Sequence, residues 1–199
     1  MSPTAEWSQT CCGIGSCGGP APDDMQFNVF DVLRIAEEVE HKAAQFYLRA
    51  AVRLPDLERR TIYYRLAGWR ARRERAWART RREYSERTGE FGTFDPDNYV
   101  LSNPQVMAGL TCFAAPSPSQ GGPVGHESPR QIVHDAIRRS QDTIVYYEGL
   151  KGFALGPESE RMIDRMIAEE DRYIRLLSRS LEKMEEPATE APSQIDASA

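Results

Sequence analysis

Apolar residues recur at spacings of three and four in four long segments of this chain, and this repeat constrains its fold more than any other feature. The first segment runs from Val29 to Val52, and Leu54-Pro55-Asp56 ends it and starts the second. The third begins near Pro129 and the fourth near Pro157. The sequence therefore predicts four amphipathic helices. Their expected inward residues are Leu33, Ala36, Ala43, Tyr47 and Ala50; Ile62, Leu66, Trp69, Trp77 and Tyr84; Ile132, Val133, Ala136, Ile137, Ile144, Tyr147 and Leu150; and Ile163, Met166, Ile167, Ile174, Leu177 and Leu181.

A long segment rich in Pro, Gly, Asn and Ser separates the second helix from the third, from about residue 89 to residue 129. Within it, only Pro104 to Ala115 has enough apolar content for a short helix. The other two connections are short, so consecutive helices pair as hairpins. The predicted fold class is all-α, a four-helix bundle of two helical hairpins joined by one long crossover.

A weak internal repeat supports two related hairpins. A shift of one hundred residues aligns Ala36 with Ala136, and Phe46-Tyr47 with Tyr146-Tyr147. Arginines align as well, but the high arginine content makes those matches less informative. The second hairpin is therefore interpreted as a copy of the first.

The two ends of the chain differ in composition from the helical part. Residues 1–25 are rich in Gly, Pro, Ser and Cys, and residues 187–199 are similarly poor in periodic apolar residues. We interpret both as flexible tails. Residues 26–186 are then one bundle domain.

All four cysteines fall outside the predicted helical stripes, at Cys11, Cys12, Cys17 and Cys112. Four are too few for a disulfide framework and suit a reducing compartment. Together they could form a thiol site for zinc or an iron–sulfur cluster, although two Cys-x-x-Cys pairs are missing. A redox role, a covalent attachment and the absence of any specific function remain open, and we favour the last.

No apolar stretch approaches the roughly 18 residues of a membrane span, and no basic region precedes an apolar core at the start of the chain. We therefore expect no membrane association and a cytoplasmic location.

The second predicted helix is strongly basic. Residues 58–87 contain eleven arginines and four acidic residues, although the whole chain carries a net charge of −5. A basic helix can bind nucleic acid, but it can equally pair with the acidic helices beside it. We favour the pairing and expect no nucleic-acid partner.

Three stretches resemble rubrerythrin-like proteins of the ferritin-like superfamily. They are AEEVEHKAAQFY from Ala36 to Tyr47, SQDTIVYYEGL from Ser140 to Leu150, and IDRMIAEEDRYI from Ile163 to Ile174. With them the resemblance covers about 150 residues. It implies a ferritin-like bundle with a di-iron or di-manganese site, built from one Glu on each of two helices and Glu-x-x-His on each of the other two.

This sequence departs from that ligand set at most positions. The resemblance places ligands at Glu40 and Glu170, which are present. It places Arg70 and Arg73 where the second helix would carry its Glu and His, and Ser140 and Tyr173 where the third Glu and the last His would stand. Arginine is always charged and cannot coordinate a cation. We therefore expect no metal cofactor, with iron or manganese on the two remaining glutamates as the alternative.

The charges of these substitutions balance. Two glutamates and two arginines sum to zero, so we hypothesise that Arg70 and Arg73 pair with Glu40 and Glu170 in a polar core, with Ser140 and Tyr173 as hydrogen-bonding neighbours.

The function expected from this reasoning is a non-catalytic scaffold or interaction module. Its expected partners are a second copy of the chain, in a homodimer, and a protein that the sequence does not identify. The alternatives are a metal-binding oxidoreductase with a modified site and a nucleic-acid-associated regulator that uses the second helix.

Overall fold

The computed structural model describes residues 26–92, 104–111, 113 and 127–184, and within these ranges the chain is almost entirely helical. The elements are α1 (Val29–Arg53), α2 (Leu57–Thr88), the short α4 (Pro104–Ala108), α5 (Pro129–Leu150), the 3₁₀ turn η2 (Lys151–Phe153) and α6 (Gly156–Lys183). The all-α four-helix prediction is confirmed. The short helix is shorter than predicted, because the chain turns after Ala108.

Capping side chains explain where α1, α2 and α5 begin. The Asn28 side chain accepts a hydrogen bond from the backbone N–H of Asp31, and Asp56 does the same for Arg59, at 2.9 and 2.8 Å. Ser128 and Gln131 form a reciprocal capping box at the start of α5, followed by Pro129. These contacts satisfy N–H groups that have no partner within the helix.

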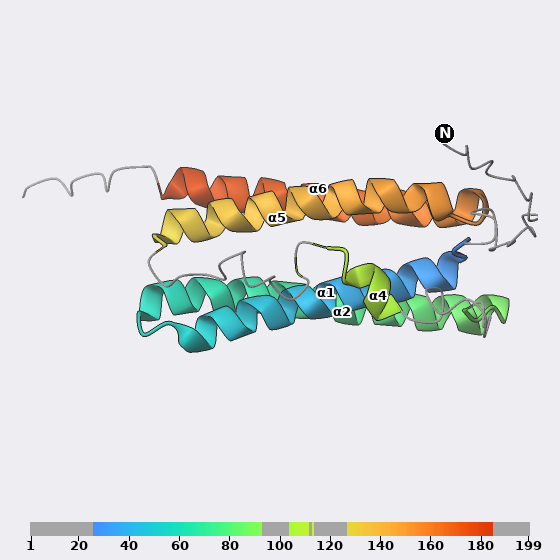
Figure 1. Cartoon of the computed structure of the whole chain (residues 1–199), viewed down its shortest axis with the longest axis horizontal. Coiled ribbons are helices and arrows are strands. Elements are labelled where there is room, and N and C mark those ends of the chain that lie inside the picture. The colour runs from blue at the N-terminus through green and yellow to red at the C-terminus, as the bar shows by residue number, and fades with distance from the viewer. Residues whose placement is uncertain (1–25, 93–103, 112, 114–126, 185–199) are drawn as a thin grey trace, which may run out of the picture.

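The four long helices form two hairpins that lie against each other, α1 with α2 and α5 with α6 (Figure 1). Helix α2 ends at the opposite end of the bundle from the start of α5 (Figure 1). Helix α4 packs against α1. At one end a parallel bridge joins Phe27 to Ala154 and ties the start of α1 to the turn of the second hairpin. The Phe27 N–H donates to the Phe153 carbonyl at 2.7 Å, and the Leu155 N–H donates to the Phe27 carbonyl at 2.8 Å.

The buried apolar residues form two clusters, one toward each end of the bundle. One contains Leu33, Val39, Trp77, Tyr147 and Met166, and the other contains Ala43, Leu66, Phe113, Ala136 and Tyr173, among others. On every long helix the residues between the clusters include a buried polar side chain. These are Glu40, Arg70, Arg73, Ser140 and Glu170. A polar layer therefore crosses the middle of the core.

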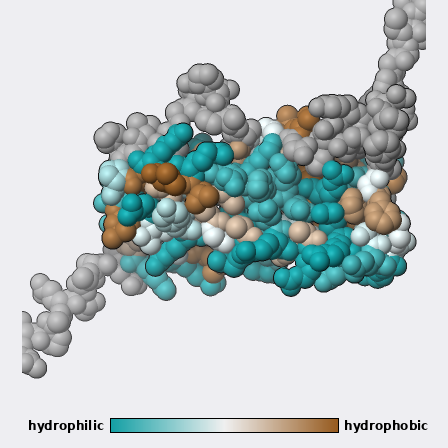
Figure 2. All heavy atoms as spheres, turned by 90° about the horizontal axis from the view of Figure 1, so that it is seen from below, coloured by the Kyte–Doolittle hydropathy of each residue, from teal (hydrophilic) through white to brown (hydrophobic). Residues whose placement is uncertain are grey.

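The outer face of the first hairpin is largely hydrophilic, but apolar side chains gather near the turn between α1 and α2 (Figure 2). The exposed large residues there include Leu48, Val52, Leu57 and Tyr64. Among the described helices, none combines the length and the apolar content needed to cross a membrane.

The buried tyrosines make a prediction about alkaline stability. Burial raises the pKa of Tyr63 to about 12 and raises the pKa values of Tyr147 and Tyr173 further. The unfolded chain loses these protons near pH 10 while the folded chain keeps them, so their contribution to stability is complete below pH 10 and is lost above it. We expect the free energy of unfolding to fall by about 1.4 kcal/mol per pH unit for each such tyrosine. The part of the tyrosinate absorbance that is absent from Tyr147→Phe should then rise together with the loss of helical circular dichroism; if that part rose well before unfolding, the burial of Tyr147 would be contradicted. This comparison leaves out the exposed Tyr64.

Candidate functional site

The polar layer draws one or two side chains from each long helix. Glu40 of α1 lies on the same helical face as Ala36 and Ala43, at i−4 and i+3, so the face that enters the core carries it inward. By the same geometry Arg70 and Arg73 stand one turn apart on the buried face of α2. Helix α5 contributes Ser140 and α6 contributes Glu170. Glu40, Arg70, Ser140 and Glu170 are fully buried, and Arg73 is 8% exposed.

Arg70 is the centre of the layer. Its Nη1 and Nη2 atoms donate to the two carboxylate oxygens of Glu170, at 2.6 and 3.2 Å. Nη1 also donates to Oε2 of Glu40 at 3.2 Å, and Nη2 donates to the Ser140 hydroxyl at 2.8 Å. A planar guanidinium fork matches a carboxylate in this two-bond geometry. Arg70 therefore connects three other helices at once.

Arg73 completes the layer from one turn further along α2. Its Nη1 donates to Oε1 of Glu170 at 2.9 Å, and its Nε lies 3.0 Å from Oε1 of Glu40. Each glutamate thus faces both arginines, and the four charges sum to zero. The charge balance suggested this pairing, and the ion pairs lie at the middle of the bundle.

The two carboxyl groups differ in their electrostatics. Burial raises the pKa of Glu40, and although Arg73 and Arg70 offset part of this effect, the neighbouring Glu170 adds to it. Burial acts in the same direction on Glu170, but Arg70 and Arg73 outweigh it and hold the pKa of Glu170 below its usual range. Burial lowers the pKa of Arg70, but Glu170 and Glu40 outweigh it and keep that guanidinium charged. Glu40 is therefore the weaker acid of the pair.

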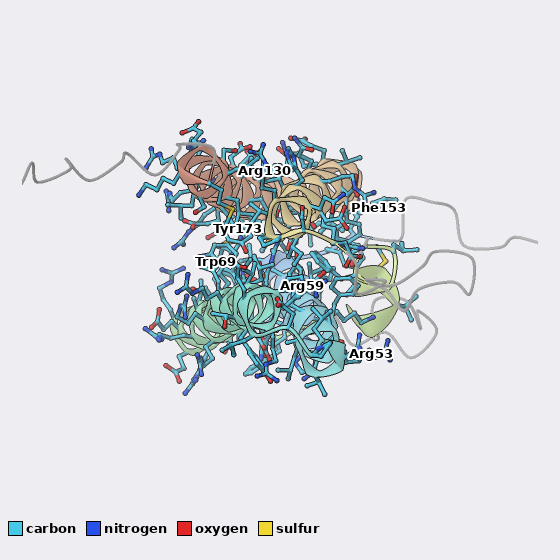
Figure 3. The ribbon with its side chains drawn as sticks, turned by 90° about the vertical axis from the view of Figure 1, so that its left-hand side faces the viewer. Arg53, Arg59, Trp69, Arg130, Phe153 and Tyr173 are labelled. Carbon is cyan, nitrogen blue, oxygen red and sulfur yellow. The ribbon has the colours of Figure 1, made fainter. Side chains whose placement is uncertain are left out.

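Aromatic rings enclose the guanidinium groups. The Cζ atom of Arg70 lies 5.0 to 5.3 Å from the ring centroids of Trp69, Phe113 and Tyr173, and Cζ of Arg73 lies 4.7 Å from that of Trp69. Trp69 and Tyr173 stack with centroids 3.5 Å apart and planes 10° apart. Figure 3 looks along the bundle and shows Trp69 of α2 directly below Tyr173 of α6. These rings keep water away from the charges and add cation–π attraction.

One part of the hypothesis about Tyr173 is wrong. Its hydroxyl was expected to hydrogen-bond to the charged groups, but it has no hydrogen-bond partner among the described residues. The stack on Trp69 fixes the ring instead. Tyr173 therefore belongs to the aromatic wall of the site.

The remaining candidate residues lie elsewhere. Glu74, the acidic residue that follows Arg73 on α2, contacts Nδ1 of His41 at 3.0 Å and does not join the layer. The four cysteines of the suggested thiol site, Cys11, Cys12, Cys17 and Cys112, all fall outside the described residues. That site stays a prediction.

A pair of iron or manganese ions does not fit this donor set. Both carboxylates already accept from guanidinium groups, and these groups fill the space between the carboxylates. Within the described ranges, no three His, Cys, Asp or Glu side chains converge as a metal site would require. The chemistry that these contacts support is charge pairing.

The aromatic wall was missed by sequence reasoning. Trp69 sits on the apolar stripe of α2, and its distance from Tyr173 depends on how two hairpins dock, which the spacing of apolar residues does not specify. Phe113 comes from the long connection, where no periodic pattern indicates its position.

Comparison with protein-family models, with curated proteins and with solved structures gives no match for this chain. Its function is therefore argued from the geometry of its own residues.

The charged layer predicts a difference between two arginines of α2. Arg70→Ala leaves Glu40 and Glu170 short of buried positive charge, so we expect the free energy of unfolding to fall by about 3–5 kcal/mol. Arg81 pairs with Glu37 through Nε at 2.9 Å, and both side chains are over a quarter exposed. Arg81→Ala should cost about 1 kcal/mol or less. Urea unfolding of both variants measures this difference, and equal losses would count against a strongly coupled layer.

Proposed function

We propose that this chain is a ferritin-like, rubrerythrin-like protein in which arginines have replaced most metal ligands, and that it acts as a non-catalytic scaffold or interaction module. The observation that carries this proposal is the position of Arg70 and Arg73 between Glu40 and Glu170. Two guanidinium groups balance the two remaining glutamates, as two divalent ions would balance four glutamates at the centre of such a bundle.

Metal analysis of the untagged protein, purified after iron and manganese are supplied to the cells, tests this proposal directly. We expect much less than one ion per chain, because the two glutamates are already neutralised. Near-stoichiometric metal that disappears in Glu40→Ala would instead favour an oxidoreductase or metal-binding protein that uses the remaining ligands.

Reversal of the substitutions tests the proposed ancestry. A variant with Arg70→Glu, Arg73→His, Ser140→Glu and Tyr173→His carries the six donors that the resemblance implies. We expect it to bind about two divalent ions per chain. A control with only Arg70→Glu and Arg73→His lacks half of the replaced donors and should bind less. A variant that is helical by circular dichroism but binds no metal would argue against this ancestry.

The outer face of the first hairpin supports the interaction role. A groove of about 400 Å³ runs between α1 and α2, with small residues along its floor. They are Ala44, Ala67, Gly68 and Ala71. Leu48 and Tyr64 also line it and are 40% and 46% exposed, and Val52, one turn beyond Leu48, is 70% exposed. When two helical surfaces pack, projecting side chains of one fill a groove of the other, and this face carries both an apolar projection and a shallow groove.

The charges along α1 indicate that the occupant of this face is a second copy of the chain. Arg49 and Arg53 lie toward one end and make no ion pair with any described residue, whereas Glu38 and the Glu74–His41 pair lie toward the other. In a symmetric dimer with its axis near Gln45, two antiparallel copies of α1 bring Arg53 close to Glu38 of the other copy, because each lies seven or eight residues from the axis. The face is therefore self-complementary in shape and in charge.

Light scattering after size-exclusion chromatography tests the dimer. We expect a mass of twice 22.5 kDa that falls toward 22.5 kDa in Leu48→Glu. The charge-reversal variants Arg53→Glu and Glu38→Arg should each weaken the dimer, and the double variant should restore it because the two charges are exchanged. A wild type that stays monomeric at high concentration, or a dimer that Leu48→Glu leaves intact, would rule out this face.

A further inference from the structure

A second cavity lies between α2 and α6, beside the charged layer but outside it. Its volume is about 160 Å³. Helix α2 lines it with Arg73, Ala76, Trp77 and Thr80, and α6 lines it with Arg165 and Glu169. Arg73 belongs to both the layer and the cavity wall, so the cavity adjoins the most polar part of the core.

Two residues that line this cavity each carry a buried N–H group without a hydrogen-bond partner among the described residues. These groups are Nη2 of Arg73 and Nε1 of Trp77, one turn apart on the same face of α2. Arg73 is 8% exposed and Trp77 is 4% exposed. A buried donor that lacks an acceptor is unfavourable, and native proteins rarely leave one without a partner. These two donors therefore remain available to an acceptor from outside the chain.

Arg165 gives the cavity a positive charge. It lies on the exposed side of α6, and its Cζ atom stands 5.7 Å from the centroid of the Trp77 ring. It makes no ion pair with the residues that the structure describes. Glu169, the acidic residue of the wall, is already paired with Arg172 through a contact of 2.5 Å. The unpaired charge at the cavity is therefore positive.

We propose that this cavity binds a small oxyanion, held by N–H groups of Arg73 and Trp77 from α2 and closed by the Arg165 guanidinium from α6. Guanidinium groups bind carboxylate and phosphate oxygens through charge-assisted hydrogen bonds. The volume is well below the about 300 Å³ at which pockets for drug-sized ligands begin, so the ligand is inorganic phosphate or a small organic acid rather than a nucleotide. This site is independent of the proposed scaffold role and of the dimer face.

The mode of entry follows from the exposure of the residues. The two donors on α2 are buried, whereas the long side chain of Arg165 is exposed and flexible. An entering anion displaces the Arg165 guanidinium from the Trp77 ring and then accepts hydrogen bonds from that guanidinium. Glu169 opposes the anion by its charge, so Glu169→Gln should tighten binding, and Arg165→Gln should weaken it.

Nuclear magnetic resonance of the ¹⁵N-labelled full chain tests the site, because the Trp77 indole N–H is one of its donors. The Trp77 signal is identified by its loss in Trp77→Phe. Phosphate and acetate are titrated separately at constant ionic strength, with chloride as the balancing anion. We expect a saturable shift of the Trp77 signal with at least one of them and a much smaller shift for Trp69. The anion that saturates at the lower concentration identifies the class of ligand.

Matched variants separate this site from general attraction to a basic helix. Arg165→Gln should raise the half-saturating concentration about tenfold, which corresponds to the loss of one charge-assisted hydrogen bond. Arg161→Gln removes the same charge one turn away on α6, outside the cavity, and should change it much less. An unchanged Trp77 signal would show that water alone fills the cavity. Equal effects of Arg165→Gln and Arg161→Gln would show that the anion is attracted nonspecifically by positive charge. Either result would overturn the proposal.

Discussion

The structure depends on the contact between Arg70 and Glu170, because it joins the two hairpins at the middle of the core. Arg70 also reaches Glu40 on its own hairpin and Ser140 on the other, so its position is correct in only one alignment of the four helices. A buried ion pair contributes little net stability, since the loss of hydration offsets the attraction. Its larger effect is on specificity: apolar clusters on either side of the layer could pack in several alignments, whereas a misaligned layer would leave buried charges without partners.

The replacement of metal ligands by arginine has a consequence for hydrogen bonding. A guanidinium group carries five N–H donors. Two guanidinium groups therefore bring ten N–H donors to the layer, whose acceptors are the five oxygen atoms of two carboxylates and one hydroxyl. Arg70 Nε and Arg73 Nη2 have no hydrogen-bond partner among the described residues, and both belong to this surplus. Aromatic rings beside the guanidinium planes compensate in part, because they favour the positive charge without accepting a directed hydrogen bond.

The sequence predicted the long helices well, because local chemistry decides them. Apolar spacing placed the core faces, and Asp56 and Pro129 stand at or beside the starts of α2 and α5. The inward position of Glu40 and Glu170 followed from the same spacing and from the resemblance. Helix α2 was harder to interpret, since Arg70 and Arg73 interrupt its buried face and weaken the apolar pattern. The resemblance placed both arginines inward, and the charge balance then suggested their partners, because α1 and α6 each offered one glutamate.

What the sequence could not predict depends on contacts between elements. The stack of Tyr173 on Trp69 needs the distance between α2 and α6, and the contact of Phe113 with Arg70 needs the path of the long connection. The cavity beside Arg73 is a further case, since Trp77 and Arg165 are 88 residues apart in the chain and each alone reads as an ordinary helical residue. The charged layer and this cavity are linked by the arginines. A core that held metal ions would be rich in acceptors, whereas this core has spare donors, and spare donors at a cavity wall favour an anion.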